Sequence, residues 1–209
     1  MKALENPIKH CKICFKLLKN NDLYEIINGD SCLCETCQNR LVPRFIKFEI
    51  LGIDGLAIYE YDDNFKSLLY QFKGCYDIEL ALIFLNKFKN EINLMYHGYV
   101  IAPAPSYYLE DEKRGFKHVE KIFENVNLPI LDVFKKTAPF KQAEHKRKQR
   151  KGIVHYLKLV FPEKLKGKKV LIVDDVCTTG ATLKALVMLV RTAKPKTIKI
   201  LVVSKREVH

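Results

Sequence analysis

The chain has 209 residues, of which 48% are hydrophobic, and its formal net charge at pH 7 is +12. This length allows one full hydrophobic core and a small appended module. No stretch contains the roughly 20 consecutive apolar residues of a membrane-spanning helix, and the first residues lack the apolar run of a secretory signal peptide. We therefore expect a cytoplasmic protein without membrane insertion, whose excess positive charge indicates either a polyanionic partner or general solubility.

Cysteines cluster near the N-terminus, where five of the seven lie between positions 11 and 37. Cys11 and Cys14 form one C-x-x-C pair, and Cys34 and Cys37 form another. Two intervening residues let both thiolates of a pair face one metal ion, so the pairs together supply the four ligands of a tetrahedral, structural zinc site. Cys32 is an alternative to Cys34, which we prefer because it completes a C-x-x-C pair.

The two cysteine pairs define a zinc-binding module over residues 1–45, in which residues 23–28 are expected to form a hairpin strand. Residues 46–209 form the second expected domain, where strand patterns alternate with helical apolar spacing. An α/β fold with a parallel twisted sheet flanked by helices is the default for such a series. The expected elements are a strand at 53–61, a helix ending at Gly74, a helix at 78–92, a strand at 98–102, a helix from about residue 116, strands at 129–134 and 170–173, a helix from residue 183 and a strand at 197–203.

The most informative stretch is residues 170–182, Val-Leu-Ile-Val-Asp-Asp-Val-Cys-Thr-Thr-Gly-Ala-Thr. Its four leading apolar residues predict a buried parallel strand, and Asp174 and Asp175 follow at the carboxyl end, where open α/β sheets bind ligands. The threonine-rich turn leads into an apolar helix, so its amides and hydroxyls gather at a helix N-terminus, which binds anions. The pattern predicts a phosphorylated sugar, with its phosphate in the turn and its hydroxyls on the acids, directly or through a metal ion.

Three other interpretations fit this stretch less well. A Walker-type NTPase requires G-x-x-x-x-G-K-[ST] upstream, and the sequence contains no such motif. A phosphoacceptor receiver domain has an acid pair after its first strand, whereas most of this fold precedes the pair. An ordinary strand, acidic turn and capped helix would leave the paired acids and the three threonines without a common explanation.

Residues 170–182 resemble the signature of type I phosphoribosyltransferases, whose ligand is phosphoribosyl pyrophosphate (PRPP). Short motifs precede it in a specific order: the cysteine pairs, Phe72-Lys73-Gly74 at a helix end, Pro103-x-Pro105-Ser106, and Arg114-Gly115-Phe116-Lys117-His118. In this order they resemble the ComF family of competence-associated, phosphoribosyltransferase-like proteins over nearly the whole chain. The resemblance implies a role in DNA uptake and natural transformation, with single-stranded DNA and a competence helicase as partners.

The resemblance also implies a PRPP site in which magnesium bridges ribose and pyrophosphate oxygens. Asp174 and Asp175 match the acids that hold the ribose hydroxyls. Arg114 and Lys117 lie in the segment expected to clamp the pyrophosphate. The loop that faces the pyrophosphate corresponds to Ala104, Pro105 and Ser106, and the loop around the 5′-phosphate corresponds to Thr178, Thr179, Gly180, Ala181 and Thr182.

The acceptor side of such a site is less well defined by the sequence. Gln142 and Arg150 match a glutamine and arginine region of the family, but the asparagine often found three residues after that arginine is replaced by Ile153. No residue set identifies a purine or pyrimidine acceptor, and the catalytic residues are unknown. An active phosphoribosyltransferase on an unidentified acceptor, unrelated to DNA uptake, is thus the alternative to a PRPP-binding protein that acts on incoming single-stranded DNA.

Several charged and polar residues have two interpretations at this stage. Residues 141–151 carry six basic side chains, which either bind DNA or close over PRPP. Lys73 is a lysine that a helix dipole would favour without any ligand, and His118 is interpreted as a surface residue because nothing local orients it. Cys177 is either a thiolate at a helix N-terminus or a small filler of the signature. The acids at the strand end are expected to contribute little to the core.

Overall fold

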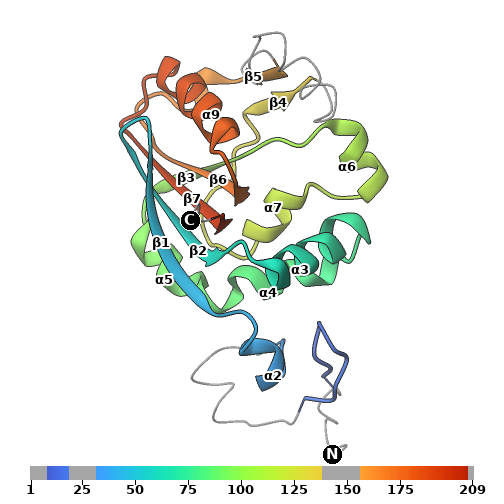
Figure 1. Ribbon diagram of the computed structural model, residues 1–209. Helices are drawn as coiled ribbons and strands as arrows, with labels where there is room; N and C mark the ends of the chain where they lie inside the picture. The colour runs from blue at the N-terminus through green and yellow to red at the C-terminus, as the bar shows by residue number, and fades with distance from the viewer. Residues whose placement is uncertain (1–8, 19–31, 138–155, 207–209) are drawn as a thin grey trace, which may run out of the picture.

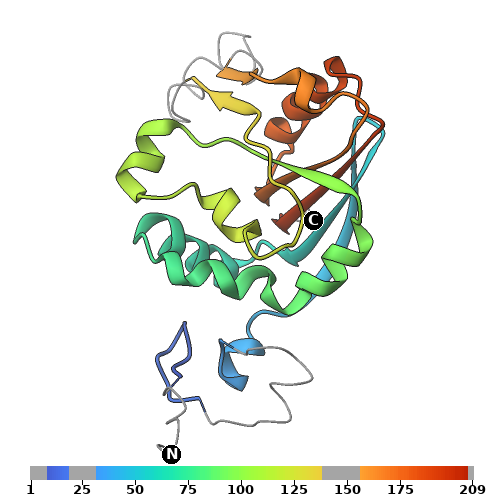
Figure 2. The same cartoon turned by 180° about the vertical axis from the view of Figure 1, so that it is seen from behind.

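The structure, a computed structural model, describes residues 9–18, 32–137 and 156–206 (Figures 1 and 2). The predicted strand at 23–28, the basic run at 141–151, and Gln142, Arg150 and Ile153 lie outside these residues.

The centre of the fold is a five-stranded sheet with the strand order β1-β2-β7-β6-β3. β1 is antiparallel to β2, and the other neighbours are parallel. A separate two-stranded antiparallel sheet joins β4 and β5. The strands are β1 (Pro43–Ile50), β2 (Ile53–Glu60), β3 (Tyr99–Pro103), β4 (Phe134–Lys136), β5 (Leu157–Leu159), β6 (Lys169–Cys177) and β7 (Thr197–Lys205).

Helices cover both faces of the five-stranded sheet, α9 on one and α3, α4, α5 and α7 on the other (Figure 1). Their bounds are α2 (Glu35–Gln38), α3 (Asp63–Gly74), α4 (Ala81–Leu85), α5 (Lys89–Met95), α6 (Tyr108–Arg114), α7 (His118–Phe123) and α9 (Ala181–Thr192), with 3-10 turns η1 (Ile78–Leu80), η2 (Asn86–Phe88) and η4 (Pro162–Lys164). The predicted α/β class with a parallel sheet flanked by helices is confirmed.

The burial of strand β6 on both faces explains the continuous apolar run at residues 170–173. Successive strand residues point to opposite faces, so Leu171 and Val173 join the core beneath α3 and α7, while Val170 and Ile172 join the core beneath α9. All four are completely buried. A strand with both faces covered cannot alternate apolar and polar residues, and this places β6 in the interior of the sheet.

Helix α3 is an amphipathic helix that positions one wall of the site. The side chain of Asp62 caps it by accepting a hydrogen bond from the backbone nitrogen of Phe65 at 2.7 Å. Its apolar residues recur at helical spacing and are buried, whereas Tyr70 on the opposite side is exposed. The helix ends at Gly74, as predicted.

Some predicted elements differ from the observed ones. The helix expected at 78–92 is divided into η1, α4, η2 and α5. Most of its apolar residues are buried although they lie on several sides of the segment, so the chain must change direction to bury them. Residues 129–133 form no regular strand but lie beside β3, where the backbone nitrogen of Ile101 donates to the oxygen of Pro129. β1 and α6 were not predicted, and α6 contains no buried residue from which to predict it.

The cysteine-bearing segment packs on the main core. Cys11, Leu33, Cys37 and Leu41 belong to the same buried cluster as α3 and α7. Lys12 also forms an ion pair of 2.6 Å with Glu79 in η1. β1 spans the predicted boundary between residues 45 and 46, and the division into two domains at that point stays a prediction.

Candidate functional site

The two acids of the signature lie inside β6, which continues to Cys177, four residues past the predicted end of the strand at residue 173. Asp174 is in register with Val202 of β7. Both acids are buried, with 9% of Asp174 and 5% of Asp175 exposed. The expectation that these side chains contribute little to the core is therefore wrong.

The turn after β6 leads directly into α9. Gly180 has a φ of +69°, in the left-handed region where glycine is favoured, and an added Cβ would lie 2.8 Å from Cδ1 of Ile50. Thr178 and Thr179 are exposed, and Thr179 Oγ1 accepts a hydrogen bond from the backbone nitrogen of Ala181 at 3.4 Å. The first backbone N–H groups of α9 thus point into a turn lined by hydroxyl groups.

A cavity of about 950 Å³ opens at this carboxyl end of the sheet. It unites eight of the predicted site residues, namely Ala104, Pro105, Ser106, Arg114, Asp174, Asp175, Thr178 and Thr182. Thr179, Gly180, Ala181 and Lys117 are not part of its lining. The wall also contains residues of α3 and α6 and one of β4 that the signature does not include: Asp63, Lys66, Ser67, Leu69, Tyr70, Lys73, Gly74, Glu110 and Lys136.

Lys117 points to a different set of partners. Its Nζ forms ion pairs with Oε1 of Glu120 at 3.0 Å and with Oδ2 of Asp132 at 2.5 Å. About half of the Lys117 side chain is exposed, whereas only 9% of the Arg114 side chain is. Of the two predicted clamp residues, only Arg114 therefore lines the cavity.

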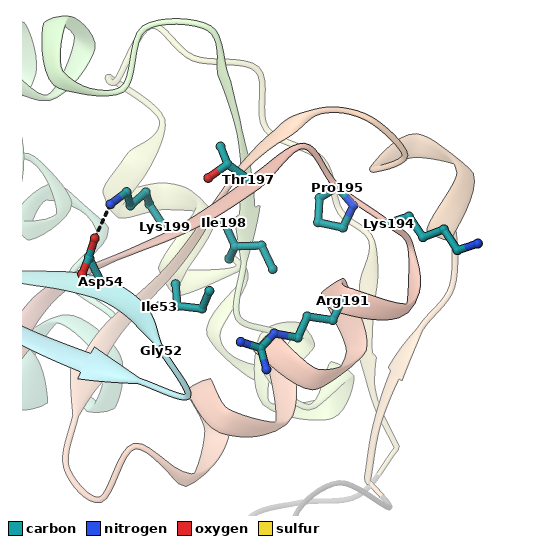
Figure 3. A pocket seen from close by; sticks show the side chains of 9 residues that line it. All are labelled: Gly52, Ile53, Asp54, Arg191, Lys194, Pro195, Thr197, Ile198 and Lys199. Carbon is teal, nitrogen blue, oxygen red and sulfur yellow. Dashed lines mark hydrogen bonds and ion pairs between the residues drawn. The ribbon is translucent and has the colours of Figure 1, made fainter.

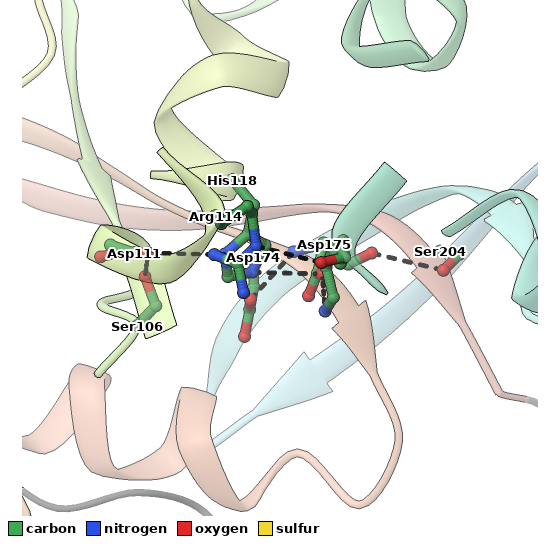
Figure 4. A network of polar contacts seen from close by, with 8 residues as sticks. Ser106, Asp111, Arg114, His118, Asp174, Asp175 and Ser204 are labelled. Atoms are coloured by element: carbon green, nitrogen blue, oxygen red, sulfur yellow. Dashed lines mark hydrogen bonds and ion pairs between the residues drawn. The ribbon is translucent and has the colours of Figure 1, made fainter. Parts of the chain in front are cut away.

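Asp175 is at the centre of a polar network that crosses the site (Figure 4). Lys73 Nζ donates to Asp175 Oδ2, and Nε2 of His118 lies 3.3 Å from the same oxygen. On the strand side, the hydroxyl of Ser204 donates to the backbone oxygen of Asp175 at 3.3 Å. The network thus holds the carboxylate of Asp175 from α3 and α7 and its backbone oxygen from β7.

Arg114 extends the network toward the loop after β3 (Figure 4). Its Nη1 lies 3.3 Å from His118 Nδ1 and donates to Asp111 Oδ1 at 3.0 Å, while its Nε donates to the backbone oxygen of Lys73 at 3.3 Å. The hydroxyl of Ser106 donates to the same oxygen of Asp111. The predicted pyrophosphate loop and the predicted sugar-binding acids therefore belong to one connected set of contacts.

Burial and neighbouring charges shift the pKa values of Asp174 and Asp175 in opposite directions. Burial by itself would raise the pKa of Asp175, but Lys73 and His118 outweigh it and hold that pKa well below its ordinary value. Burial raises the pKa of Asp174 well above its ordinary value, and the charge of Asp175 adds to this effect. Burial also lowers the pKa of His118. An ionised carboxylate thus stands beside a carboxyl group that favours its protonated form.

The sequence led to a wrong interpretation of His118 and left the role of Lys73 open. His118 is buried, with 9% exposed, so its interpretation as a surface residue is wrong. Lys73 contacts a partner 102 positions away in the chain, beyond any local pattern. The signal that could have found both was their place in the ordered motifs Phe72-Lys73-Gly74 and Arg114-Gly115-Phe116-Lys117-His118.

Cys177 and the aromatic residues near Arg114 mainly pack against other side chains. Cys177 is buried, and burial raises the pKa of its thiol, which disfavours the thiolate. Phe116 stacks on Phe72 with ring centroids 5.2 Å apart. Tyr107 and Tyr108 pack edge to face on each other with centroids 4.9 Å apart.

The four cysteines of the two C-x-x-C pairs also converge. Their sulfur atoms all lie within 4.8 Å of one another, and Cys14 Sγ is 3.6 Å from Cys34 Sγ. Zinc with bonds of about 2.3 Å to sulfur holds tetrahedral ligands at nearly this separation. Burial would raise the pKa of Cys11, but hydrogen bonds from the backbone near Cys14 and Cys34 lower it to about 6, whereas burial and the neighbouring cysteines raise the pKa of Cys37. The cluster has the geometry of a metal site.

Comparison with known proteins agrees with this architecture. Residues 96–208 match the family model of the phosphoribosyl transferase domain. A curated relative, "Competence protein ComFC" of Streptococcus pneumoniae, is 26% identical over 220 residues, covering 90% of this chain and 96% of the relative. No described helix has the length and apolar character needed to cross a membrane.

Among the solved structures, two matches cover part of this chain at low identity. A hypoxanthine-guanine phosphoribosyltransferase from Bacillus anthracis is 17% identical, with a TM-score of 0.38 over 63% of this chain and 75% of that one. An allosteric regulatory enzyme of purine biosynthesis is 16% identical, with a TM-score of 0.38 over 59% of this chain and 26% of that one. Because the family model covers more than half of the 209 residues, the chain belongs to the phosphoribosyltransferase domain family, as a ComF-type member with a clustered set of N-terminal cysteines.

Proposed function

We propose that this protein binds PRPP at the carboxyl end of β6. The observation that carries the proposal is the single cavity that joins Asp174, Asp175, Thr178 and Thr182 with the Ser106 loop. A phosphorylated sugar with a second phosphate group needs an anion site at one end, hydroxyl acceptors in the middle and cations at the other end. The described residues offer these three environments side by side.

The turn before α9 is the proposed site of the 5′-phosphate. α9 is 12 residues long, and its first turn carries no acidic side chain that would repel an anion. Its unpaired N–H groups and the helix dipole favour negative charge, and the hydroxyls of Thr178, Thr179 and Thr182 add hydrogen bonds. Gly180 and Ala181 complete the turn without filling it.

The two acids are the proposed partners of the ribose hydroxyls. Asp175 is an ionised acceptor, and Asp174, whose pKa is raised, offers both a donor and an acceptor while it is protonated. A diol can donate to the first group and exchange hydrogen bonds with the second. Burial of both acids strengthens such bonds, because water competes less in a site of low dielectric constant.

The pyrophosphate is proposed to lie toward Ala104, Pro105 and Ser106, with Arg114 and Lys73 as cations. Arg114 presents a planar guanidinium that suits phosphate oxygens, and burial by its neighbours orients it. Lys117 would reach the ligand only by leaving Asp132 and Glu120. We therefore assign the clamp to Arg114 first and to Lys117 only in a rearranged state.

The residues that line the cavity fit a magnesium ion that enters the site bound to PRPP. Asp175 Oδ2 is already shared by Lys73 and His118, which leaves few protein oxygens for a cation. Mg²⁺ retains waters and favours phosphate oxygens over an all-protein cage, so it would enter with the pyrophosphate and neutralise its charge. The metal at the N-terminus is a different case, because Cys11, Cys14, Cys34 and Cys37 offer four sulfurs, for which zinc is the proposed occupant.

In the cell, we propose a cytoplasmic competence protein that acts with a helicase on incoming single-stranded DNA. The named relative, "Competence protein ComFC", supports this role, as does the net charge of +12. Binding to single strands should weaken as salt rises, with a logarithmic slope of about −0.7 for each neutralised phosphate. Replacing Lys146, Arg147, Lys148, Arg150 and Lys151 by glutamine should flatten the slope if the basic run contacts DNA. The same variant should instead lose PRPP affinity if that run closes over PRPP.

Catalysis is the second candidate function, an active phosphoribosyltransferase on an acceptor unrelated to DNA uptake. The favouring observation is that Arg114, Lys73 and Ser106 gather where a departing pyrophosphate would carry its charge. Release of pyrophosphate in the presence of a nucleophilic acceptor, with a slow or absent reaction without it, would support this alternative.

Calorimetric titration of Mg²⁺ and PRPP tests the binding proposal. The wild type should bind, and Thr178→Ala should lower the affinity about 10- to 100-fold, since a hydrogen bond to a charged group contributes about 1.5–3 kcal/mol. Thr192→Ala is the matched control at the far end of α9, where the hydroxyl donates only to the backbone of Leu189. Absence of binding by the wild type, or equal losses in the two variants, would overturn the proposal.

A further inference from the structure

Two of the groups assigned to the pyrophosphate are already bonded to an acid of the protein itself (Figure 4). Asp111 lies in α6, and its Oδ1 accepts a hydrogen bond from the hydroxyl of Ser106 and another from Nη1 of Arg114 at 3.0 Å. Ser106 and Arg114 line the cavity at the end of β6, whereas Asp111 is not part of its lining. One carboxylate oxygen therefore binds, from outside the lining, two groups that face the cavity.

The hydroxyl of Ser106 cannot donate to Asp111 and to a ligand at the same time. A serine hydroxyl has one hydrogen to donate, and phosphate oxygens accept hydrogen bonds. While that hydrogen is donated to Asp111, Ser106 presents only lone pairs to a phosphate oxygen. A pyrophosphate therefore receives a hydrogen bond from this hydroxyl only after Asp111 has released it.

The charge of Arg114 is balanced by the same carboxylate. Only 9% of the Arg114 side chain and 16% of the Asp111 side chain are exposed, so water weakens the attraction between them less than it would at the surface. Lys73, the second cation assigned to the pyrophosphate, is paired with Asp175. An anionic ligand thus meets two cations whose charges protein carboxylates already balance.

Asp111 is not the only residue that orients Arg114. Nε of Arg114 also donates to the backbone oxygen of Lys73 at 3.3 Å, and its Nη1 lies 3.3 Å from Nδ1 of His118. These contacts come from α3 and α7, and they remain when Asp111 releases the guanidinium. The carboxylate therefore competes for Arg114 more than it positions it.

The helix that carries Asp111 can release the contact at a low cost. α6 contains no buried residue, so moving it exposes little apolar surface. Elements with few buried contacts open locally at a lower free energy than the core does. Asp111 can therefore withdraw while the sheet that carries Asp174 and Asp175 keeps its structure.

We propose that Asp111 is an autoinhibitory anion, which occupies Ser106 and Arg114 in the unliganded site and must release both before a pyrophosphate group binds. This inference rests on the proposed PRPP function, because that function places the pyrophosphate beside Ser106 and Arg114. It adds a residue of α6 that lowers affinity, and does so selectively. A pyrophosphate carries several negative charges and displaces one carboxylate, whereas a ligand that has only the 5′-phosphate does not reach this contact.

The test compares magnesium pyrophosphate with ribose 5-phosphate, which lacks the pyrophosphate, by calorimetric titration. Asp111→Ala should raise the affinity for pyrophosphate about 10- to 100-fold, as expected when a charged hydrogen bond no longer competes. Asp111→Asn keeps an uncharged acceptor and should raise the affinity only about 3- to 10-fold, because charge-assisted hydrogen bonds are roughly twice as strong as neutral ones. Neither variant should change the affinity for ribose 5-phosphate, which also shows that both variants are folded.

Two variants that remove the same charge elsewhere are matched controls. Glu112 is the next residue of α6, is exposed, and has no hydrogen bond or ion pair with another described residue. Asp54 pairs with Lys199 in a second cavity, of about 430 Å³, near the amino end of β7 (Figure 3). Glu112→Gln and Asp54→Asn should leave the affinity for pyrophosphate within about twofold of the wild type, because salt screens charges that are exposed and distant.

An affinity for pyrophosphate that falls or stays the same in Asp111→Ala would overturn the inference, as would an equal rise in Glu112→Gln. Binding of PRPP by the wild type would leave the proposed function intact in both cases. If the wild type and Asp111→Ala both fail to bind PRPP, pyrophosphate and ribose 5-phosphate, the proposed function and the inference fail together.

Discussion

The N-terminal cysteine cluster and the network at the end of β6 both gather groups that bind cations. At β6, the protein supplies cationic side chains of its own. In the cluster, four sulfurs lie within 4.8 Å of one another and could hold a metal ion. At β6, by contrast, Lys73 and His118 already contact Asp175. We therefore propose that a metal ion holds the cysteine cluster together, whereas ion pairs between protein side chains hold the strand-end site.

Removing one sulfur from the cluster should have the largest effect. Structural zinc contributes about 10–16 kcal/mol in zinc-finger peptides, so Cys34→Ser should lose most of the bound zinc and unfold the N-terminal segment. Zinc content measured by mass spectrometry of metals, together with proteolysis of the N-terminal segment, checks this result.

Cys32→Ser is the matched control for that experiment. Cys32 lies outside the group of four sulfurs, so this variant should keep its zinc. Loss of zinc in the Cys32 variant with retention in the Cys34 variant would reassign the ligand. A wild-type protein that folds fully without metal would contradict the contrast between the two regions.

Removing the charge of Asp175 should have the next largest effect, on the stability of the unliganded protein. Asp175→Asn leaves Lys73, whose side chain is 32% exposed, without its carboxylate partner, so the cost should fall below the roughly 3–5 kcal/mol of a fully buried pair. Urea unfolding should show the loss, and the double variant Lys73→Met with Asp175→Asn should recover part of it. If the single and double variants were equally unstable, the ion pair would not be the cause.

These long-range contacts mark the limit of prediction from the sequence. The cysteine site and the signature each follow from short spacings, and the structure brings together the four sulfurs and both acids as predicted. The role of Lys73 stayed open and His118 was misjudged, because their partner lies on another element and burial of a histidine depends on packing that no local pattern records. The α/β class followed from apolar runs with both faces covered, such as that of β6.

Errors in the elements have a similar origin. The segment at 78–92 has a helical composition, but apolar side chains on several of its sides required 3-10 turns between its short helices. α6 has no buried residue, so the spacing rule for amphipathic helices had nothing to detect, although it carries Arg114 into the site. The sequence thus located the loops that line the cavity better than the helices that support them.

Asp174→Asn should have a smaller effect on stability, and in the opposite direction, because it should stabilise the folded protein. Because the folded-state pKa of Asp174 is raised, folding is favoured by its protonated form, and stability falls as pH rises from the ordinary value of 3.8 through the folded-state value. Asparagine keeps the oxygen that accepts from the backbone nitrogen of Asp175 and cannot ionise. The variant should therefore melt at a higher temperature than the wild type at neutral pH, by about 2–4 °C for each kcal/mol in a chain of this size.

The gain from Asp174→Asn should disappear below pH 3.8, where the carboxyl group is protonated in the folded and unfolded states alike. PRPP affinity at neutral pH should fall at the same time, if Asp174 exchanges hydrogen bonds with the ribose. A stability gain that does not change with pH would show that ionisation of Asp174 is not its source. A lower melting temperature at neutral pH would contradict the prediction outright.

The smallest effect is expected for substitution of Lys117. Comparing it with substitution of Arg114 distinguishes an exposed ion pair from a buried polar network. Its partners Glu120 and Asp132 are themselves partly exposed, and such pairs contribute about 0–1 kcal/mol. Lys117→Gln should therefore leave stability nearly unchanged and alter PRPP affinity less than about threefold, whereas Arg114→Gln should lower the affinity at least about 10-fold through loss of a charged hydrogen bond. Lys117 and Arg114 both carry a positive charge and lie close together in the chain, so comparing the two variants tests their position relative to the cavity rather than their charge. A loss at Lys117 equal to that at Arg114 would mean that Lys117 leaves Asp132 to reach the bound ligand.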